Sequence, residues 1–146
     1  RIPHETRGNT VICTLTRGGI VVATLSDMNR TTNRPARLAL KALTLAASSP
    51  IHGDLVWSLP TQGADGSWTP GAWHEVKGAV EYRANGLHVC GCDQVAYWKQ
   101  LVRRVRPGLR TKVWVVEYDG QTSIGAHGFA ARRVRLVRPW DGREEV

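Results

Sequence analysis

The chain of 146 residues lacks several features that would place it at once in a compartment or a class. No apolar run approaches the roughly 18 residues that a membrane-spanning helix needs, and residues 1–6 lack the apolar core of a secretory signal. Only 3 cysteines are present, and Cys90 and Cys92 are too close in sequence to form an unstrained disulfide with each other. We therefore expect a cytoplasmic protein with reduced thiols and no membrane partner.

The sequence also lacks a complete catalytic or cofactor motif, so we expect no cofactor and the sequence assigns no reaction. Its length suits one domain over residues 1–146, and a hydrophobic content of 42% is enough for a core. His88, Cys90 and Cys92 would share one face of a regular strand, either as metal ligands or as a buried strand end. They offer at most three ligands before a predicted helix start, and we expect no bound metal.

Basic residues are concentrated in one part of the chain. Ten of the 20 lysines and arginines lie between residues 99 and 138, where Glu117 and Asp119 are the only acidic residues. This segment accounts for the whole formal charge of +8. Arginine, which makes bidentate phosphate contacts and stacks on bases, predominates there and favours a polyanionic partner. A solubilising surface or a GC-rich genome would give the same composition.

The pattern of apolar and turn residues predicts an α+β fold, a mainly antiparallel sheet of hairpins with two packed helices. The predicted strands cover residues 10–25 as a hairpin that contains Cys13, then 51–59, a second hairpin of 73–82 and 87–90 across Asn85-Gly86, 112–118 and 133–136. One helix is expected from Asn33 or Arg34 to Ala47, and another from an Asp93 cap to Val105. Residues 60–72 read as a loop, and a further turn is expected at Asp119-Gly120.

Part of the chain, from about residue 68 to 139, resembles a known family. The similarity lies in Trp73-His74, in Gly86-Leu87-His88-Val89-Cys90, in Tyr97-Trp98, and in residues 113–120 and 131–137. In this order they resemble a small uncharacterised domain of bacteriophages and actinobacteria. Relatives often carry a further cysteine near the position of Tyr82 or Arg83, which this chain lacks. The resemblance implies a phage or prophage origin and action inside a bacterial cell.

Three functional hypotheses follow. The first is a small basic phage-type accessory protein that binds nucleic acid, DNA or RNA, without catalysis. Its expected contacts are phosphate-binding arginines and stacking tryptophans, namely Arg103, Arg104, Arg110, Arg133, Arg135, Trp68 and Trp73. The second is an ADP-ribosyltransferase-like or other nucleotide-using enzyme, based on His74, Tyr82 and Glu117 in that order. The third is a binder of a host protein, for which 6 tryptophans would supply an interface.

Overall fold

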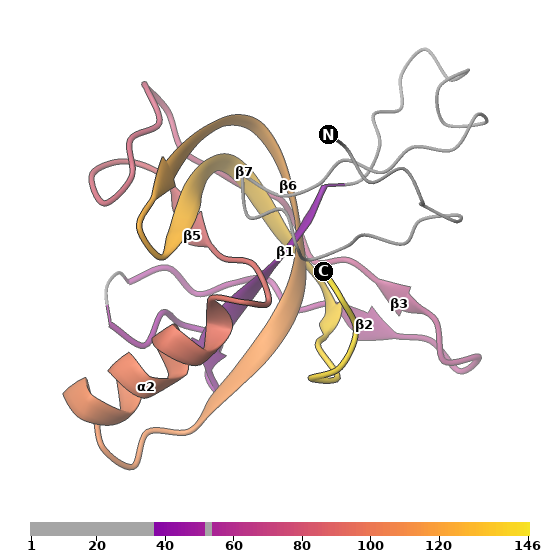
Figure 1. Cartoon of the computed structure of the whole chain (residues 1–146). Coiled ribbons are helices and arrows are strands. Elements are labelled where there is room, and N and C mark those ends of the chain that lie inside the picture. Colours follow the sequence, from indigo (N-terminus) through magenta and orange to yellow (C-terminus); the bar gives the residue numbers. More distant parts are fainter. Residues whose placement is uncertain (1–36, 52–53) are drawn as a thin grey trace.

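The fold is mainly an antiparallel sheet (Figure 1). The computed structural model describes residues 37–51 and 54–146, so the hairpin predicted over residues 10–25 lies outside the described residues. The elements are β1 (Leu38–Thr44), β2 (Thr61–Gln62), β3 (Trp68–Thr69), β4 (His74–Glu75), β5 (Leu87–Val89), α2 (Val95–Val105), β6 (Thr111–Gly125) and β7 (Gly128–Pro139). Within this part of the chain no helix is long and apolar enough to cross a membrane.

The long hairpin of β6 and β7 is the centre of the sheet. β6 pairs with β1 on one side and β7 on the other, while β7 also pairs with β4 and β5, and every pairing is antiparallel. The register of β6 and β7 shifts between Asp119 and Thr122, where Gly120 has a φ of 81°. Such a bulge increases local bending, and the hairpin curls over the sheet in Figure 1.

The sheet closes on itself beyond the end of β5. The amide of Leu40 in β1 donates to the carbonyl of Cys90 at 2.7 Å, and the amide of Cys90 donates back to Leu40 at 2.9 Å. β1, β6, β7 and β5 therefore form a continuous ring of hydrogen-bonded neighbours. Closure pairs strand edges that would otherwise be open to another chain.

Two apolar clusters cover the two faces of this closed sheet. The inner cluster includes Leu43, Trp57 and Tyr118. The outer cluster includes Leu40, Val95 and Val115 with the C-terminal Val146, so α2 and the end of the chain pack on the outside of β1 and β6. Burial of large apolar side chains on both faces is the main stabilising term.

The predicted helix over residues 34–47 is wrong, and with it the predicted class of two helices packed on a sheet. Its described part is the strand β1, and the described residues contain a single helix, α2. β1 has the sequence Leu-Ala-Leu-Lys-Ala-Leu-Thr, which places apolar residues on both faces of the strand. Such a run fits a strand buried on two sides as well as a buried helix, and pairing with β6 decides in favour of the strand.

Several local predictions are also corrected. The segments on either side of Asn85-Gly86 do not form a hairpin with each other, since β4 and β5 each pair with β7. Residues 51–59, where described, form only a bridge between Val56 and Ser48. α2 begins after Gln94, without a side-chain cap from Asp93. β6 continues through the turn expected at Asp119-Gly120 and ends at Gly125.

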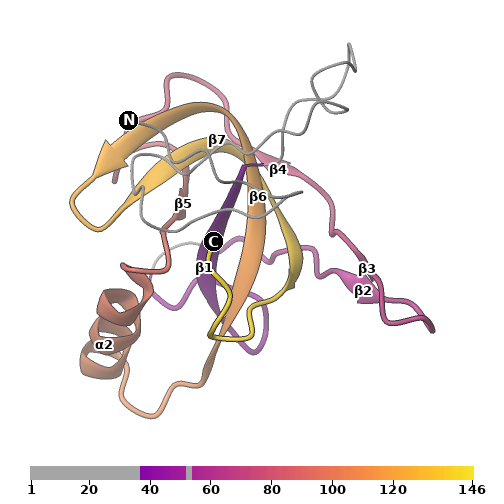
Figure 2. The same ribbon diagram turned by 45° about the vertical axis from the view of Figure 1, so that its right-hand side comes forward.

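The segment predicted as a loop over residues 60–72 contains an antiparallel arm. β2 and β3 pair only with each other, and the arm extends away from the closed sheet (Figure 2). Its base is fixed because the Gly71 amide donates to Leu136 of β7 at 2.9 Å. A Cβ at Gly71 would lie 2.1 Å from the Ser58 carbonyl oxygen, so only glycine allows this approach.

Candidate nucleic-acid interface

The C-terminal end of α2 carries a basic surface. Lys99, Arg103 and Arg104 are exposed, and the helix contains no acidic residue. Cations in a last helical turn are favoured by the helix dipole, which accounts for part of this placement. Among the described residues, the guanidinium groups of Arg103 and Arg104 have no hydrogen-bond or ion-pair partner, and both side chains are exposed.

This basic surface continues into a shallow depression of about 350 Å³ beyond the helix. Its lining comes from the end of β1 and from the α2–β6 connection, namely Thr44, Leu45, Ala46, Ser48, Arg106, Leu109 and Arg110. Arg106 donates to the carbonyl of Pro50 at 3.0 Å, which fixes this guanidinium across the two segments. Arg110 is exposed and, within the described residues, has no polar partner. We call Lys99, Arg103, Arg104 and Arg110 the α2 basic surface.

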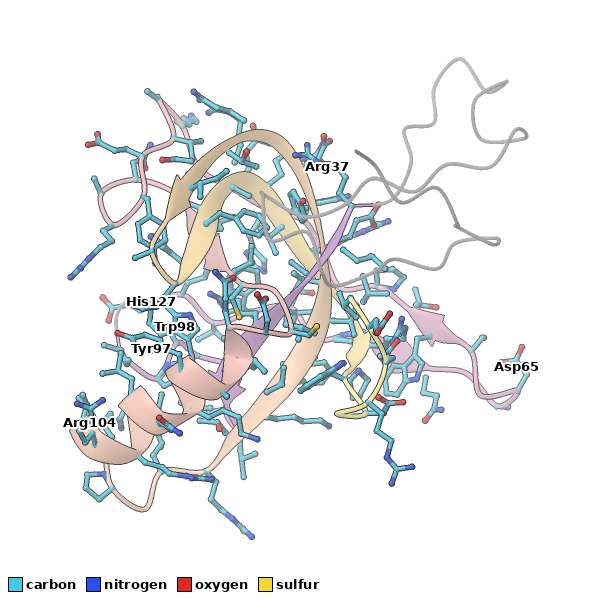
Figure 3. The ribbon with its side chains drawn as sticks, viewed as in Figure 1. Arg37, Asp65, Tyr97, Trp98, Arg104 and His127 are labelled. Carbon is cyan, nitrogen blue, oxygen red and sulfur yellow. The ribbon has the colours of Figure 1, made fainter. Side chains whose placement is uncertain are left out.

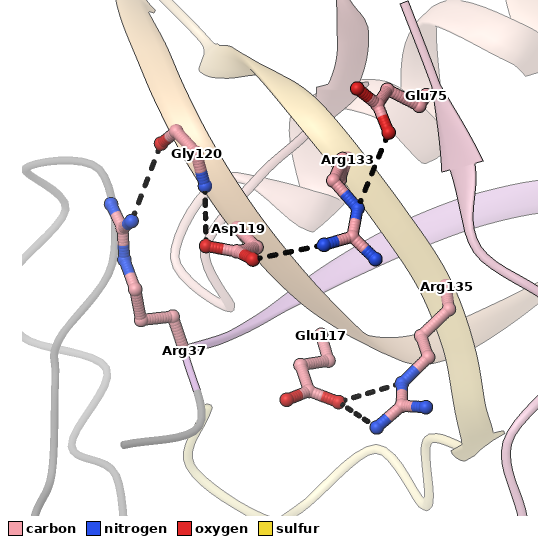
Figure 4. A network of polar contacts seen from close by, with 7 residues as sticks. All are labelled: Arg37, Glu75, Glu117, Asp119, Gly120, Arg133 and Arg135. Carbon is pink, nitrogen blue, oxygen red and sulfur yellow. Dashed lines mark hydrogen bonds and ion pairs between the residues drawn. The ribbon is translucent and has the colours of Figure 1, made fainter. Parts of the chain in front are cut away.

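Arg133 and Arg135 lie elsewhere, on the outer face of β7, and both are ion-paired (Figure 4). Arg135 binds Glu117 through Nε at 2.8 Å and a terminal nitrogen at 2.7 Å. Arg133 contacts Asp119 at 3.2 Å and, through Nε, Glu75 at 3.6 Å. Each guanidinium lies opposite its carboxylate in the strand register. The two acidic residues of the basic segment therefore compensate two of its arginines.

Trp73 packs against Arg133 and Arg135, which together with their carboxylate partners we call the ion-paired group. The guanidiniums of Arg133 and Arg135 lie 4.3 Å and 4.6 Å from the centre of its ring. Cation–π contacts of this kind occupy the ring face that a base would need. Trp68 is half-buried on β3 of the projecting arm. The structure thus separates the seven residues predicted from sequence into the α2 basic surface, the ion-paired group and the arm.

An aromatic cluster that the sequence prediction missed lies where α2 meets the β6–β7 turn (Figure 3). The rings of Tyr97 and His127 are stacked, with centroids 3.7 Å apart and an interplanar angle of 11°. Trp98 stands at 87° to Tyr97, and its indole nitrogen donates to the carbonyl of His127 at 2.6 Å. Tyr97 lies in a helix that the sequence predicted. His127 was not recognised because the turn was expected at Asp119-Gly120, whereas it lies between Gly125 and Gly128.

Lys41 is a second feature that the sequence did not reveal. Its side chain lies on the same face of β1 as Ala39 and Leu43, which belong to the inner cluster. Its ammonium donates to the carbonyl of His88 at 2.5 Å. The same nitrogen lies 5.1 Å from the ring centre of Trp57. Burial lowers the pKa of Lys41 to about 8, an effect that the nearby Cys90 partly opposes. No acidic partner of Lys41 occurs among the described residues.

His88, Cys90 and Cys92 do not converge. The His88 ring lies against Tyr82 and its Nε2 accepts the amide of Arg83 at 2.8 Å. Cys90 is buried and free, and burial raises its pKa to about 12. Cys92 is disulfide-bonded in the structure. Within residues 37–51 and 54–146, no group of three or more His, Cys, Asp or Glu residues could hold a metal ion.

Two of the three residues behind the enzyme hypothesis, His74 and Glu117, are also separated. His74 pairs with Val134, which in turn pairs with Tyr118, so these side chains share the inner face. Glu117 precedes Tyr118 and lies on the outer face with Arg135. The His74 and Glu117 side chains therefore point to opposite sides of the sheet and form no common site.

Comparisons with known proteins complete the description of the site. No protein-family model, curated protein or solved structure matches this chain. The chemistry of the α2 basic surface and its surroundings is therefore the evidence for function.

Proposed function

We propose that this chain is a small basic phage-type accessory protein that binds nucleic acid, DNA or RNA, without catalysis. The observation that carries the proposal is the uncompensated charge of the α2 basic surface. Arg103, Arg104 and Arg110 are exposed and lack polar partners among the described residues, whereas Arg133 and Arg135 are held by carboxylates. Phosphate groups would supply the missing negative charge.

The structure distinguishes the five arginines that the sequence predicted as equal phosphate contacts, because two of them are ion-paired. Neutralising a phosphate releases condensed counterions only when the arginine charge is available. The α2 basic surface meets this condition. To bind phosphate, Arg133 would have to give up its ion pair with Asp119, and Arg135 its ion pair with Glu117. Each exchange would leave a partly buried carboxylate without its cation, which costs free energy. We therefore assign phosphate binding mainly to Arg103, Arg104 and Arg110.

The first prediction concerns the salt dependence of binding. Labelled DNA and RNA are titrated at several salt concentrations with the parent and with an Arg103→Ala/Arg104→Ala variant. We expect binding that weakens steeply with salt, and a logarithmic salt slope that is smaller by about two units in the variant. Arg133→Ala/Arg135→Ala should change the slope by about one unit or less, because these charges are already compensated.

A matched control removes the same charge from another place. Lys77 and Arg83 are exposed in the segment between β4 and β5, and Lys77→Ala/Arg83→Ala lowers the net charge as much as the α2 double variant does. If the two double variants have the same slope, the effect is one of net charge and the assignment to α2 is wrong. If the parent binds neither DNA nor RNA at low salt, the nucleic-acid proposal is wrong and binding to a host protein becomes the working hypothesis.

We also propose that the protein acts in the cytoplasm of a bacterial host cell, as the family resemblance implies. That compartment keeps cysteines reduced, while Cys92 is disulfide-bonded in the structure. The second prediction is that Cys92 is alkylated when thiols are trapped at the moment of lysis and the protein is analysed by mass spectrometry. Buried Cys90 serves as the internal control, since it should react only after denaturation. A Cys92 protected until reduction would contradict a cytoplasmic location.

A further inference from the structure

The aromatic cluster beside the α2 basic surface has a geometry suited to unpaired bases. We propose that Tyr97 and His127 form a stacking platform for a base of single-stranded nucleic acid; this inference rests on the proposed function and specifies its ligand. Tyr97 is 37% exposed and His127 is also exposed. Figure 3 shows both residues on the same side of the molecule as Arg104.

The platform is held in place before any ligand binds. The bond from the Trp98 indole to the His127 carbonyl ties the β6–β7 turn to α2, and Trp98 itself packs against the outer apolar cluster. Tyr97 is held by an edge-to-face contact with Trp98 and by stacking on the His127 ring. A base that extends this stack would meet rings that are already ordered, which reduces the entropy lost on binding.

The neighbouring charges define the class of ligand. Arg104 follows Tyr97 by seven residues, which places both on one face of the helix about 10 Å apart along its axis. A strand with a base on the platform could therefore place a phosphate near Arg104. No acidic side chain of α2 interrupts this face. Bases of a duplex are stacked on each other and offer no free face, so the combination selects a single strand.

The test compares a labelled single strand of about 15 nucleotides with its duplex, by fluorescence anisotropy, for the parent and for Tyr97→Leu and Tyr97→Phe. Leucine keeps an apolar side chain but removes the ring, and phenylalanine keeps the ring. We expect Tyr97→Leu to weaken single-strand binding about 5- to 100-fold and duplex binding less than about twofold. Tyr97→Phe should stay within about twofold of the parent.

Salt dependence separates this inference from the proposed function. Stacking does not release counterions, so Tyr97→Leu should lower single-strand affinity at every salt concentration without changing the slope. His127→Leu, in an exposed turn outside both apolar clusters, provides a second variant should Tyr97→Leu disturb the helix. Equal binding of strand and duplex with no effect of either variant would overturn the platform while the salt-dependent contacts stand. Absence of binding to both ligands at low salt would overturn the proposed function as well.

Discussion

At the scale of single residues, Lys41 is a cation placed on the apolar inner face of the sheet. Its ammonium has one backbone acceptor, the His88 carbonyl, and an aromatic face, Trp57. Neither contact replaces the hydration that an ammonium has in water, so burial disfavours the charged form and lowers its pKa to about 8. The position therefore links the stability of the fold to pH.

The third prediction follows from this linkage. The unfolded chain holds its Lys41 proton up to the ordinary pKa of 10.5, whereas the folded chain releases it near pH 8. The cost of the buried charge is thus fully present below about pH 8 and is relieved as the pH rises toward 10.5. Lys41→Met should be more stable than the parent at neutral pH, by about 1 to 2 kcal/mol, and this advantage should shrink in alkaline solution.

Chemical denaturation of both proteins at several pH values measures this difference. The parent and the variant must be compared because Cys90 changes the stability of both with the opposite pH dependence. Its pKa is raised in the folded protein, so the free energy of unfolding falls once the thiol of the unfolded chain ionises near pH 9. Lys112→Met controls for the loss of an exposed lysine. Parallel stability curves for the parent and Lys41→Met between pH 8 and pH 10.5 would show that Lys41 is not a buried cation.

At the scale of elements, the pairing of β6 and β7 sets both the core and the ion-paired group. Their register places Val116 opposite Leu136 on the inner face and Glu117 opposite Arg135 on the outer face. A slip of one residue would move the carboxylates and the apolar side chains to the wrong faces. The ion pairs thus support the register more than they add stability, because pairs that are partly exposed contribute little.

The fourth prediction is the size of that contribution. A double-mutant cycle with Glu117→Gln and Arg135→Gln should give a coupling energy of about 0.5 to 1 kcal/mol at low salt, and a smaller one at high salt. Side-chain exposures of 30% for Arg135 and 22% for Glu117 favour the upper part of this range. A control cycle of Arg135 with the exposed Glu145 should give no coupling. A coupling that persists unchanged at high salt would indicate a desolvated pair instead.

The elements also show what the sequence could predict. α2 was predicted correctly because Val95, Trp98 and Val102 recur with helical spacing and only one side is buried. The strand over residues 133–136 was predicted for the corresponding reason, because arginines alternate there with Val134 and Leu136 and only one face is apolar. β1 was missed because both of its faces are apolar, so the sequence carried no period that separates a strand from a helix.

The candidate site was predictable from the sequence only in part. The charge of the segment from residue 99 to 138 was evident from composition. Which arginines are compensated depends on pairing between β6 and β7, because Glu117 and Asp119 are far from Arg135 and Arg133 in sequence. The stacking of Tyr97 on His127 depends on where the β6–β7 turn lies. The sequence placed a turn at Gly120, which in the structure is a bulge within β6.

At the scale of the whole molecule, closure of the sheet defines the most stable unit. The bridge between Leu40 and Cys90 joins the first and last members of the ring, so their amides become exposed only when the sheet opens. The arm, in contrast, is joined to the body at its base and buries little. The protein should therefore show two distinct levels of local stability.

The fifth prediction uses amide hydrogen exchange. The amides of Leu40 and Cys90 should exchange at rates that correspond to global unfolding, while the arm amides of Gly63 and Gly66 exchange at least about 100-fold faster. Exchange measured by NMR on the folded protein compares all four in one sample. The Val76 amide, which donates to Arg132, serves as an intermediate reference. Fast exchange of Leu40 and Cys90 would show that the ring opens without unfolding of the rest.

The projecting arm has a practical consequence for experiments on living cells. Gly66, at its tip, has a φ of 87° and no neighbouring atom within 4 Å of the position of a Cβ. Exposed tips of this kind tolerate inserted peptides, and Figure 3 shows Asp65 of the same tip on the opposite side of the molecule from Arg104. A short epitope or fluorogenic tag inserted beside Gly66 would therefore report where the protein accumulates in cells while leaving both termini unmodified.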